Sequence, residues 1–546
     1  MTDWNYADAL EVVASRLPGA TALVHGDVRR SFAVFDRRAN GVAKWLLDLG
    51  VERQDHVAQY LWSGPEYLES VVACFKVGLV PVNTNYRYLE DELAYIWNDS
   101  ASVAVVFHST FTDRIDSLRL SGKVDHVRGW LWVSDGSDAV CPPWATSYEE
   151  AAAPLDEPTR APWGRSGDDL WIIYTGGTTG LPKGVMWRQD DLFVILNRGA
   201  ARHIAENASL DDVAAQLTSP GPALVACAPM MHGAGLFSAL TTMVSGGAIA
   251  ILVGRSFDPD ELLELIQREG IKAVTIIGDA FAKPILAALE AGDYDISSLR
   301  LIASSGVMWS KATKDGLLRH KPDLILVDTL GSTEAAGVAR SISIGTSGPA
   351  IATSSFQLGA DGMIIRENGT PADVGEPGLL AVRGRGPVGY WGDEVKTAST
   401  FRVIDGEKWS VPGDWATVDA NGTLFLLGRG AMCINTGGEK VYSEEVEEVI
   451  KTHAAILDAC IVGTPDDRFG QAVTAMVELR PGANLDSADL IAHVRTKLAA
   501  YKAPRRVLVV DSVGRSQTGK LDYRRLREEA ARLLEEAPVA SQASSA

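Results

Sequence analysis

The sequence predicts an α/β protein with a large first domain and a smaller last one. Short apolar runs alternate with helical patterns from Ala22 to Val327, and such alternation favours α/β layers with a largely parallel sheet. From about Gly375 the chain becomes glycine-rich, with alternating apolar and polar residues that predict β structure. At 546 residues the chain is also too long for one hydrophobic core, so at least two domains are expected.

The first segments predict a hairpin, a helix and further strands. Ala22–His25 and Ser31–Val34 form the hairpin, and Gly50 is placed to end the helix that follows. One face of that helix is apolar and carries Val42, Trp45, Leu46 and Leu49. A second helix is expected over Leu89–Trp97, with Leu89 on its apolar side. Strands are expected at His56–Trp62, Pro81–Asn85 and Val103–Phe107.

The middle of the chain begins with a loop and then again alternates predicted strands with predicted helices. Residues 134–168 carry little periodicity and are interpreted as loop, and strand Leu170–Tyr174 then runs into a glycine-rich stretch. Helical segments such as Pro259–Arg268 separate the short apolar runs that follow. These runs predict buried strands at Leu224–Ala228, Ala248–Leu252, Ala273–Ile277, Leu301–Ala303 and Leu324–Val327.

A domain boundary is predicted at Gly428-Arg-Gly430, where a β segment ends. The domains are then residues 1–428 and 429–546. The smaller one has an α+β pattern, with helices at Ser443–Lys451 and Ser487–Leu498 and strands at Ile456–Gly463 and Ala472–Glu478. From Ala537 the residues are small and polar, and this tail is expected to be disordered.

Composition argues against several kinds of partner and site. The net charge of −19 disfavours nucleic acid and anionic membranes. Five cysteines without CxxC spacing predict buried thiols in a reducing compartment, and the histidines form no zinc-binding pair. The N-terminus lacks a signal-peptide pattern, and no apolar run reaches the length of a membrane span. A cytoplasmic enzyme with no integral membrane segment is expected.

The most distinctive motif is Thr175-Gly-Gly-Thr-Thr-Gly-Leu-Pro-Lys183. It holds three glycines, three threonines and one lysine. Glycine lets backbone N–H groups approach an anion, while hydroxyls and an ammonium add donors and charge, so the motif suits the phosphates of a nucleotide. It is not a Walker A loop, because Gly184 stands where that motif needs a hydroxyl for Mg²⁺. A glycine-rich surface turn is the alternative.

Four further motifs accompany the glycine stretch. They are Leu330-Gly-Ser-Thr-Glu334, Trp409-Ser-Val-Pro-Gly-Asp414, Gly428-Arg429 and Gln517-Thr-Gly-Lys520. In order and spacing they resemble the signatures of the adenylate-forming superfamily, and within it the acyl-CoA synthetases, from roughly residue 20 to residue 527. The resemblance implies a large N-terminal domain of α/β layers with mixed sheets and a β-rich subdomain, followed by a small, mobile α+β C-terminal domain.

The resemblance also implies a reaction. In that family a carboxylate attacks the α-phosphate of ATP, which releases pyrophosphate, and the thiol of coenzyme A then displaces AMP from the acyl-adenylate. The cofactors would be ATP, Mg²⁺ and coenzyme A, the partner a small-molecule carboxylic acid, and the family leaves room for a homodimer. Val82–Tyr88 and Asn435–Lys440 look most like bacterial ligases for long-chain fatty or steroid side-chain acids.

The resemblance assigns the nucleotide to residues spread along the chain. Glu334 would hold Mg²⁺, with Thr333 beside the α-phosphate. Asp328 would accept the adenine amino group, and Asp414 and Arg429 would bind the ribose. The phosphate-binding residues would be Thr175, Gly176, Gly177, Thr178, Thr179, Gly180 and Lys183. From the residues alone, a solvated turn carboxylate and a β-turn aspartate are the alternatives for Glu334 and Asp414.

Two residues would act at the acyl group. Lys520 would neutralise charge that develops between the carboxylate and the α-phosphate, and His232 would lie beside the acyl carboxylate. An exposed surface lysine and a core histidine are the alternatives. Gly437 and Gly438 would line the approach of the thiol. Gly233-Ala-Gly235 is uniformly small, which favours a bulky acyl group unless backbone crowding requires these residues.

Two positions depart from the family pattern. Leu330 replaces the tyrosine that stacks on adenine, and Met432 stands at the hinge position that is commonly Asp or Lys, so Gly430 is the alternative pivot. Two other functions stay open. One is an enzyme that passes its adenylate to a carrier protein or to oxygen chemistry, and the other is a nucleotide-binding homologue without turnover. The retained charged residues of every motif argue against the latter.

Overall fold

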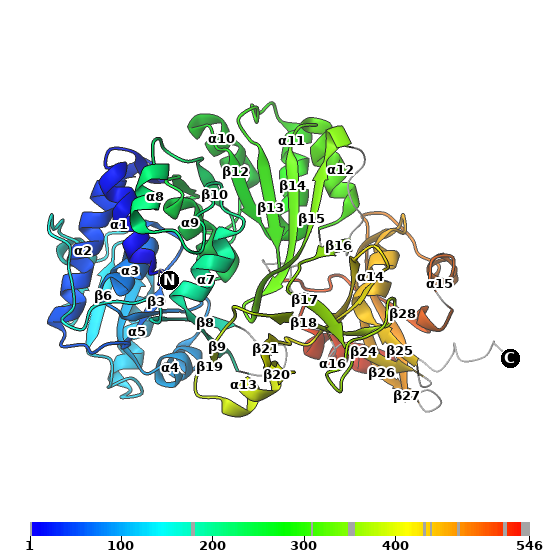
Figure 1. Ribbon diagram of the computed structural model, residues 1–546. Coiled ribbons are helices and arrows are strands. Elements are labelled where there is room, and N and C mark those ends of the chain that lie inside the picture. Colours follow the sequence, from blue (N-terminus) through cyan, green and yellow to red (C-terminus); the bar gives the residue numbers. More distant parts are fainter. Residues whose placement is uncertain are drawn as a thin grey trace. The chain divides into compact units, whose positions relative to one another are not determined.

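The computed structural model divides the chain into two compact units, each described here by itself (Figure 1). Unit 1 comprises Met1–Gly177, Leu181–Ile351 and Arg383–Ser410, and unit 2 comprises Thr178–Gly180, Ala352–Val382 and Val411–Ala546. The described residues are 3–175, 181–306, 309–347, 355–429, 433–436, 439–466, 470–498, 500–516 and 521–536. The predicted domain boundary after Gly428 stays a prediction, and the tail from Ala537 lies outside the described residues.

Two mixed sheets frame unit 1 in the part of the chain that the structure describes. The first runs in the order β2-β1-β11-β10-β12-β13-β14-β15. Its neighbours are parallel except for the pairs β1–β2 and β14–β15, which are antiparallel. The strands are β1 Thr21–His25, β2 Val28–Ser31, β10 Leu224–Ala226, β11 Ile249–Ile251, β12 Ala273–Ile276, β13 Leu301–Ser305, β14 Ile325–Ser332 and β15 Ala335–Ile344.

The second sheet of unit 1 has the order β19-β9-β8-β4-β3-β5-β6-β7. Its central strands β8, β4, β3 and β5 are parallel, so their carboxyl ends share one edge, where α/β proteins place ligands. Its strands are β3 His56–Tyr60, β4 Val80–Asn83, β5 Ser102–His108, β6 Gly129–Val133, β7 Thr146–Ser147, β8 Leu170–Thr175, β9 Lys183–Arg188 and β19 Gly389–Tyr390. A hairpin of β20 Phe401–Ile404 and β21 Glu407–Ser410 also belongs to unit 1.

Helices cover both sheets of unit 1 and bury two apolar cores (Figure 1). One core packs α10, α11 and α12 against β12, β13 and β14 through residues such as Leu262, Phe281 and Ile302. The larger core includes α1, α2, α3 and α9, and its fully buried Trp97 and Trp171 supply much of the apolar contact. The helices are α1 Tyr6–Arg16, α2 Phe32–Asp48, α3 Pro65–Lys76, α4 Glu90–Asp99, α5 Thr112–Leu120, α6 Tyr148–Ala151, α7 Gln189–Asn197, α8 Leu210–Gln216, α9 Gly233–Val244, α10 Pro259–Glu269, α11 Gly278–Ala291, α12 Lys311–His320 and α13 Glu394–Thr400. Within the described residues, no helix combines the length and the apolar character needed to cross a membrane.

Most predicted elements of unit 1 are confirmed, but helix caps move some of their ends. Ser31 Oγ accepts a hydrogen bond from Val34 N–H at 3.3 Å, so α2 begins at Phe32 and the predicted strand Ser31–Val34 is wrong. Leu89 precedes α4 as its N-cap and is 61% exposed, so placing it on the apolar side was also wrong. The loop predicted over residues 134–168 is largely irregular but contains β7 and α6.

Unit 2 contains an antiparallel β segment and an α+β segment. The first includes the neighbours β16–β23–β22–β18, with β17 paired to β18. In the second, β26 and β27 form a long antiparallel pair that β28 extends in parallel, and α14, α15 and α16 pack on these strands. The bounds are β16 Ser355–Leu358, β17 Gly362–Ile365, β18 Gly378–Arg383, β22 Asp414–Val418, β23 Thr423–Arg429, β24 Cys433–Thr436, β25 Glu439–Tyr442, β26 Ile456–Asp466, β27 Gly470–Leu479, β28 Arg506–Val509, α14 Ser443–Lys451, α15 Ser487–Arg495 and α16 Tyr523–Glu536.

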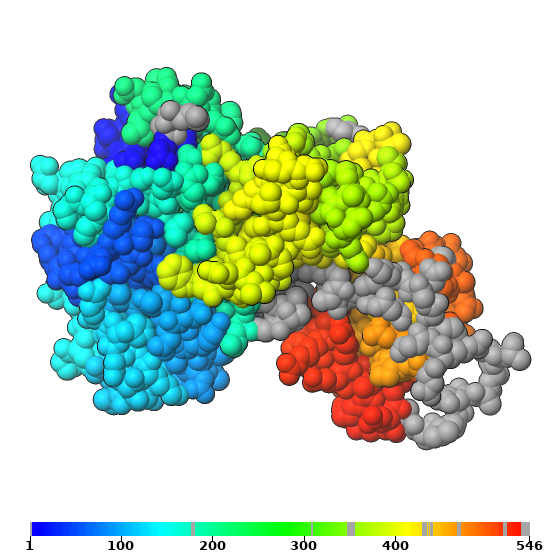
Figure 2. Space-filling model, turned by 60° about the horizontal axis from the view of Figure 1, so that its bottom comes forward, coloured from blue at the N-terminus to red at the C-terminus, as the bar shows by residue number. Residues whose placement is uncertain are grey.

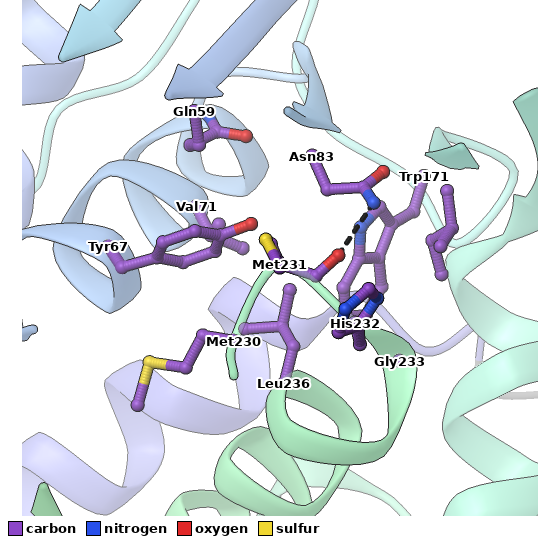
Figure 3. A pocket seen from close by; sticks show the side chains of 11 residues that line it. Gln59, Tyr67, Val71, Asn83, Trp171, Met230, Met231, His232, Gly233 and Leu236 are labelled. Carbon is purple, nitrogen blue, oxygen red and sulfur yellow. Dashed lines mark hydrogen bonds between the residues drawn. The ribbon is translucent and has the colours of Figure 1, made fainter. Parts of the chain in front are cut away.

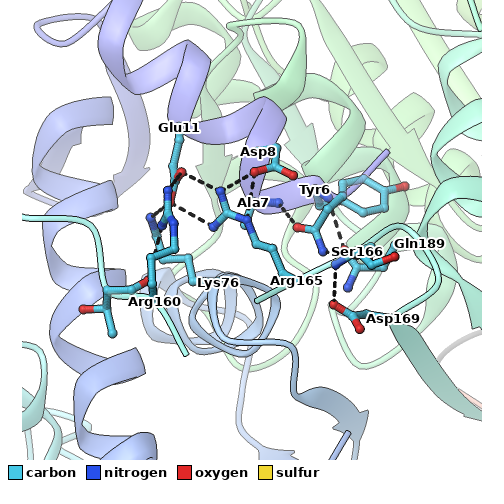
Figure 4. A network of polar contacts seen from close by, with 12 residues as sticks. Tyr6, Ala7, Asp8, Glu11, Lys76, Arg160, Arg165, Ser166, Asp169 and Gln189 are labelled. Carbon is cyan, nitrogen blue, oxygen red and sulfur yellow. Dashed lines mark hydrogen bonds and ion pairs between the residues drawn. The ribbon is translucent and has the colours of Figure 1, made fainter. Parts of the chain in front are cut away.

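A charged network fastens the N-terminal helix α1 within unit 1 (Figure 4). The Glu11 carboxylate accepts from Lys76 at 2.7 Å and from Arg160 and Arg165 at 2.6 Å. Burial opposes ionisation of Glu11, but the hydrogen bonds from Arg165 and Arg160 hold its pKa well below the usual range. Tyr6 N–H donates to Gln189 Oε1 at 3.1 Å. The helix is thereby tied to α3, to the loop before β8 and to the segment after β9.

His108 predicts how the stability of unit 1 depends on pH. It is buried at the end of β5, and its Nδ1 accepts a hydrogen bond from Trp62 N–H at 3.1 Å, which requires the neutral ring. Burial lowers the pKa of His108 to about 4, whereas an unfolded histidine titrates near 6.5. Below pH ~6.5 the unfolded chain therefore takes up the proton first, and stability is lost as the pH falls towards 4.

The test is a His108→Asn variant, whose side-chain oxygen can accept the same N–H without titrating. Between pH 7 and pH 5 the free energy of unfolding of the wild type should fall by about 2 kcal/mol more than that of the variant. Thermal unfolding at both pH values measures this difference. Parallel losses of Tm in the two proteins would show that His108 does not titrate on unfolding.

Candidate active site

The glycine stretch connects two paired strands of the second sheet. β8 ends at Thr175 and β9 begins at Lys183, and these two residues are register partners in the antiparallel pair. Both ends of the connection are anchored, since Tyr95 Oη donates to Pro182 O at 3.0 Å and Tyr174 Oη to Asp99 Oδ2 at 2.6 Å. The predicted phosphate-binding residues Gly176, Gly177, Thr178, Thr179 and Gly180 lie outside the described residues.

The segment Arg383–Ser410 returns to this part of unit 1, where it appears in yellow beside the blue and cyan surface of the first half of the chain (Figure 2). β19 pairs with β9, and Trp391 N–H donates to Gly184 O at 2.7 Å. Lys183 Nζ forms an ion pair with Asp393 Oδ2. The hydrogen bond from Lys183 lowers the pKa of Asp393. Lys183, the predicted phosphate ligand, thus has an internal carboxylate partner.

This ion pair predicts the effect of Asp393→Asn on nucleotide binding. The variant keeps the side-chain oxygen that accepts Lys396 N–H at 2.8 Å at the start of α13, but it removes the charge that competes with phosphate. Because an isolated ion pair near the surface is weak, the KM for ATP should fall only modestly, by roughly twofold. Lys183→Met should raise it. An unchanged or higher KM for ATP in Asp393→Asn would contradict a phosphate-binding role for Lys183.

Thr333 and Glu334 form the tight turn between β14 and β15, where three side chains fix them. Trp187 Nε1 donates to Thr333 O at 2.9 Å, and Ser410 Oγ donates to Glu334 O at 2.5 Å. Tyr390 Oη donates to Glu334 Oε1 at 2.8 Å. The backbone of the turn is therefore held by partners from β9 and β21, and the Glu334 carboxylate is held by Tyr390 from β19.

The Glu334 turn fits an Mg²⁺ ion bound together with a nucleotide. Among the described residues there is no group of three or more acidic, cysteine or histidine side chains that could enclose a metal. Mg²⁺ in nucleotide sites is commonly held by one or two carboxylates and the phosphates themselves, so it does not need such a group. A half-buried carboxylate oriented through one oxygen by Tyr390 is a donor of the required kind.

His232 begins helix α9 and lines a small cavity of about 10 Å³ (Figure 3). The cavity is mainly apolar, with Val71 and Trp171 among its walls, and its volume is close to that of one water-sized sphere. Tyr67 also lines it, and the buried Tyr67 hydroxyl has no hydrogen-bond partner among the described residues. The predicted place of His232 beside the acyl carboxylate is untested by this cavity and stays a prediction.

The small residues beside His232 have a packing role. A Cβ at Gly235 would lie 2.3 Å from Ala228 O and 2.7 Å from Pro229 O, so the start of α9 approaches the backbone before it closely. A Cβ at Gly233 would meet the ring of Phe237 at 2.9 Å. The alternative of backbone crowding is therefore confirmed for Gly235, whereas Gly233 is crowded by a side chain. Gly233-Ala-Gly235 gives no independent support for a bulky acyl group.

Asp328 lies on β14 and is buried, with 4% of its surface exposed. Lys314 Nζ from α12 donates to Asp328 Oδ2 at 3.2 Å. Burial raises the pKa of Asp328, and Lys314 opposes this rise. One carboxylate oxygen thus already has a partner within unit 1, and the predicted bond to the adenine amino group would have to use the other.

The remaining predicted site residues belong to unit 2. Asp414 begins β22 and Arg429 ends β23, and the two are register partners in this antiparallel pair. Their predicted roles at the ribose stay predictions. Gly437, Gly438 and Lys520 lie outside the described residues, as do Gly430 and Met432 of the predicted hinge.

Several residues of the site were not predicted from the sequence. Tyr390 forms the short strand β19 and holds Glu334, and no sequence motif had singled it out. Asp393 and Asn83 each bind a predicted part of the site. For Asn83 the sequence did contain an indication of function. It ends a buried parallel strand, and α/β folds place functional side chains at such strand ends.

Comparison with known proteins agrees with this arrangement. A family model described as "AMP-binding enzyme" matches residues 10–391, and one described as "AMP-binding enzyme C-terminal domain" matches residues 445–520. The chain is similar to a medium-chain acyl-CoA ligase of Mycobacterium avium, with 36% identity over 95% of this chain and 97% of that one. It is 37% identical to a 3-oxocholest-4-en-26-oate–CoA ligase of Rhodococcus rhodochrous, with 95% of each chain covered.

The fold resembles the crystal structure of an anthranilate CoA ligase in complex with anthranoyl-AMP. The TM-score is 0.83 at 22% identity, over 98% of this chain and 99% of that one. This likeness confirms the expected α/β fold class with a large N-terminal and a small C-terminal part. The chain therefore belongs to the AMP-binding enzyme family, among its acyl-CoA ligases.

Proposed function

We propose that this chain converts a medium- or long-chain fatty acid, or a steroid side-chain acid, to its coenzyme A thioester through an acyl-adenylate. The observation that carries the proposal is its relationship, over nearly the whole chain, to ligases named for medium-chain acyl groups and for 3-oxocholest-4-en-26-oate. The anchored turn at Glu334 and the strand pair at Lys183 support a nucleotide-dependent reaction.

In the proposed first step the protein positions charge and does little covalent work. Lys183 and Thr175 bind the β- and γ-phosphates, and Thr333 lies beside the α-phosphate. Mg²⁺, when bound, supplies positive charge against the phosphates, and Glu334 is the residue that would hold it. Asp328 selects the base, while Asp414 and Arg429 bind the ribose hydroxyls. His232 orients the acyl carboxylate from the wall of the mainly apolar cavity.

The proposed second step uses residues of the C-terminal part. Lys520, also in this part, acts only in the first step, where it neutralises charge while the adenylate forms. It is not needed once the adenylate exists. Gly437 and Gly438 then line the approach of the coenzyme A thiol, whose attack on the acyl carbon expels AMP. The predicted motion between these steps would pivot near Gly430.

The proposed substrate class is tested with a panel of acids. AMP release dependent on coenzyme A should be highest for medium- and long-chain or steroid side-chain acids and weak for acetate and propionate. Because one methylene in an apolar pocket changes specificity about 10-fold to 200-fold, neighbouring chain lengths should separate clearly. Turnover confined to acetate or propionate would remove the bulky-acid assignment while leaving ligase activity intact.

We also propose a cytoplasmic location and a homodimer. The thiols of Cys74, Cys141, Cys227 and Cys460 are free, as expected in a reducing compartment. Sedimentation at micromolar concentration decides between a monomer and a dimer.

A further inference from the structure

We propose that Asn83 is a positioning residue that fixes the strand end before the glycine stretch and the turn before His232 relative to each other. The inference rests on the proposed function, because it concerns how two parts of one site are held at a fixed distance. These parts are the strand end at the phosphate-binding stretch, called the phosphate side, and the turn at His232, called the acyl side.

The Asn83 side chain binds the backbone of two segments that are far apart in the sequence. Asn83 Oδ1 accepts from Tyr174 N–H at 2.7 Å, and Asn83 Nδ2 donates to Tyr174 O at 3.0 Å. The second N–H of the amide donates to Met231 O at 2.7 Å (Figure 3). Tyr174 directly precedes Thr175, and Met231 directly precedes His232.

Only an amide fits this set of partners. The side chain at position 83 must offer one acceptor to Tyr174 N–H and two N–H donors to two carbonyl oxygens. The amide of asparagine provides both the acceptor and the two donors. A carboxylate of the same shape would face both carbonyls with an acceptor. An alkyl side chain would leave three backbone groups without a partner beside the buried residues Tyr174 and Met231.

The turn before His232 has a second anchor, which makes the role of Asn83 separable. Ser63 Oγ accepts from Met230 N–H at 3.0 Å, so Ser63 holds the turn but makes no bond to Tyr174. Asn83 holds the turn and the strand end together. Loss of Ser63 should therefore disturb the acyl side alone, whereas loss of Asn83 should disturb both sides.

The experiment compares Asn83→Asp and Ser63→Ala with the control Asn40→Asp. Asn40 is fully buried in α2, and its amide also bonds backbone groups, with Nδ2 donating to Leu155 O at 3.2 Å. It contacts none of the candidate site residues. Acid-dependent exchange of pyrophosphate into ATP is measured while ATP and acid are varied separately. Because each unsatisfied buried group costs appreciable free energy, Asn83→Asp should lower kcat/KM about tenfold to a hundredfold for both substrates.

Ser63→Ala should lower kcat/KM for the acid and leave that for ATP within about threefold of the wild type. In a His232→Ala background, Asn83→Asp should lose most of its effect on the acid and keep its effect on ATP, as expected for a residue that acts through His232. Equal multiplicative effects in both backgrounds would overturn the inference. So would an Asn83→Asp profile that matches Asn40→Asp.

The folded fraction of each variant is checked by thermal unfolding. If Asn83→Asp does not fold, Ser63→Ala alone decides, because equal losses for ATP and acid would contradict separate anchoring of the turn. A wild type that shows no exchange with any acid would instead refute the proposed function, and the inference with it. Exchange in the wild type with unaltered kinetics in Asn83→Asp would refute the inference alone.

Discussion

Replacing Lys520 by alanine should slow formation of the acyl-adenylate by about a hundredfold to a thousandfold, the loss typical of a group that stabilises charge only in the transition state. Conversion of supplied acyl-adenylate to thioester should stay within about threefold of the wild type. The reason is that negative charge meets at the acid and the α-phosphate only while the adenylate forms. Single-turnover assays of the two half-reactions measure both values.

A matched control for Lys520 is Lys497→Ala in the same part of the chain. Lys497 Nζ donates to Thr452 Oγ1 at 2.8 Å at an exposed position and has no assigned role in the reaction. This variant should retain both half-reactions. If Lys520→Ala lost both half-reactions equally, the proposed separation of the two steps would be incorrect.

Replacing Glu334 by glutamine should reduce overall turnover about a hundredfold and shift the Mg²⁺ dependence to higher concentration. The amide keeps the length and the oxygen that Tyr390 Oη contacts at 2.8 Å, but it removes the charge that a hard cation prefers. The Mg²⁺ titration distinguishes loss of a metal ligand from a change in folding. An unchanged Mg²⁺ dependence would contradict the proposed role.

Tyr390→Phe is the companion variant for Glu334. It removes the hydrogen bond from Tyr390 Oη to Glu334 Oε1 and leaves the carboxylate in place. Because the hydroxyl orients the ligand without touching the metal, the loss should be about tenfold, smaller than that of Glu334→Gln. A loss as large as that of Glu334→Gln would mean that Tyr390 contacts substrate itself.

Local sequence was sufficient where periodicity and capping agree. Helix α14 begins and ends at the predicted residues Ser443 and Lys451, with acidic residues in its first turn and a basic one in its last. The contiguous motifs likewise led to Lys183 and Glu334. Where a polar side chain caps a helix instead of continuing a strand, as Ser31 does, pattern alone gave the wrong boundary.

Contacts between distant segments could not be predicted from one sequence. Asn83 and Met231 are 148 positions apart, and Trp187 and Thr333 are 146 apart. Such pairs carry no local pattern, because propensity and periodicity describe only near neighbours along the chain. The three bonds that fix the Glu334 turn and the bond from the Asn83 amide to Met231 O therefore became visible only in the fold.

Gly235 is a second case in which the sequence alone could not decide between two structural roles. From the sequence, Gly235 was open to two interpretations, space for a substrate or close approach of the backbone. A Cβ at Gly235 would lie only 2.3 Å from Ala228 O, which decides for the second. The substrate class now depends on the relatives and not on this motif.

The central claim is that one chain first makes an adenylate and then a thioester. Its most direct test measures AMP release from ATP with a long-chain or steroid side-chain acid, with and without coenzyme A. We expect acid-dependent pyrophosphate exchange without coenzyme A, and sustained AMP release with formation of the acyl-CoA only when coenzyme A is added. Pyrophosphate exchange with AMP release that does not respond to coenzyme A would contradict the claim and assign the acyl group to another acceptor.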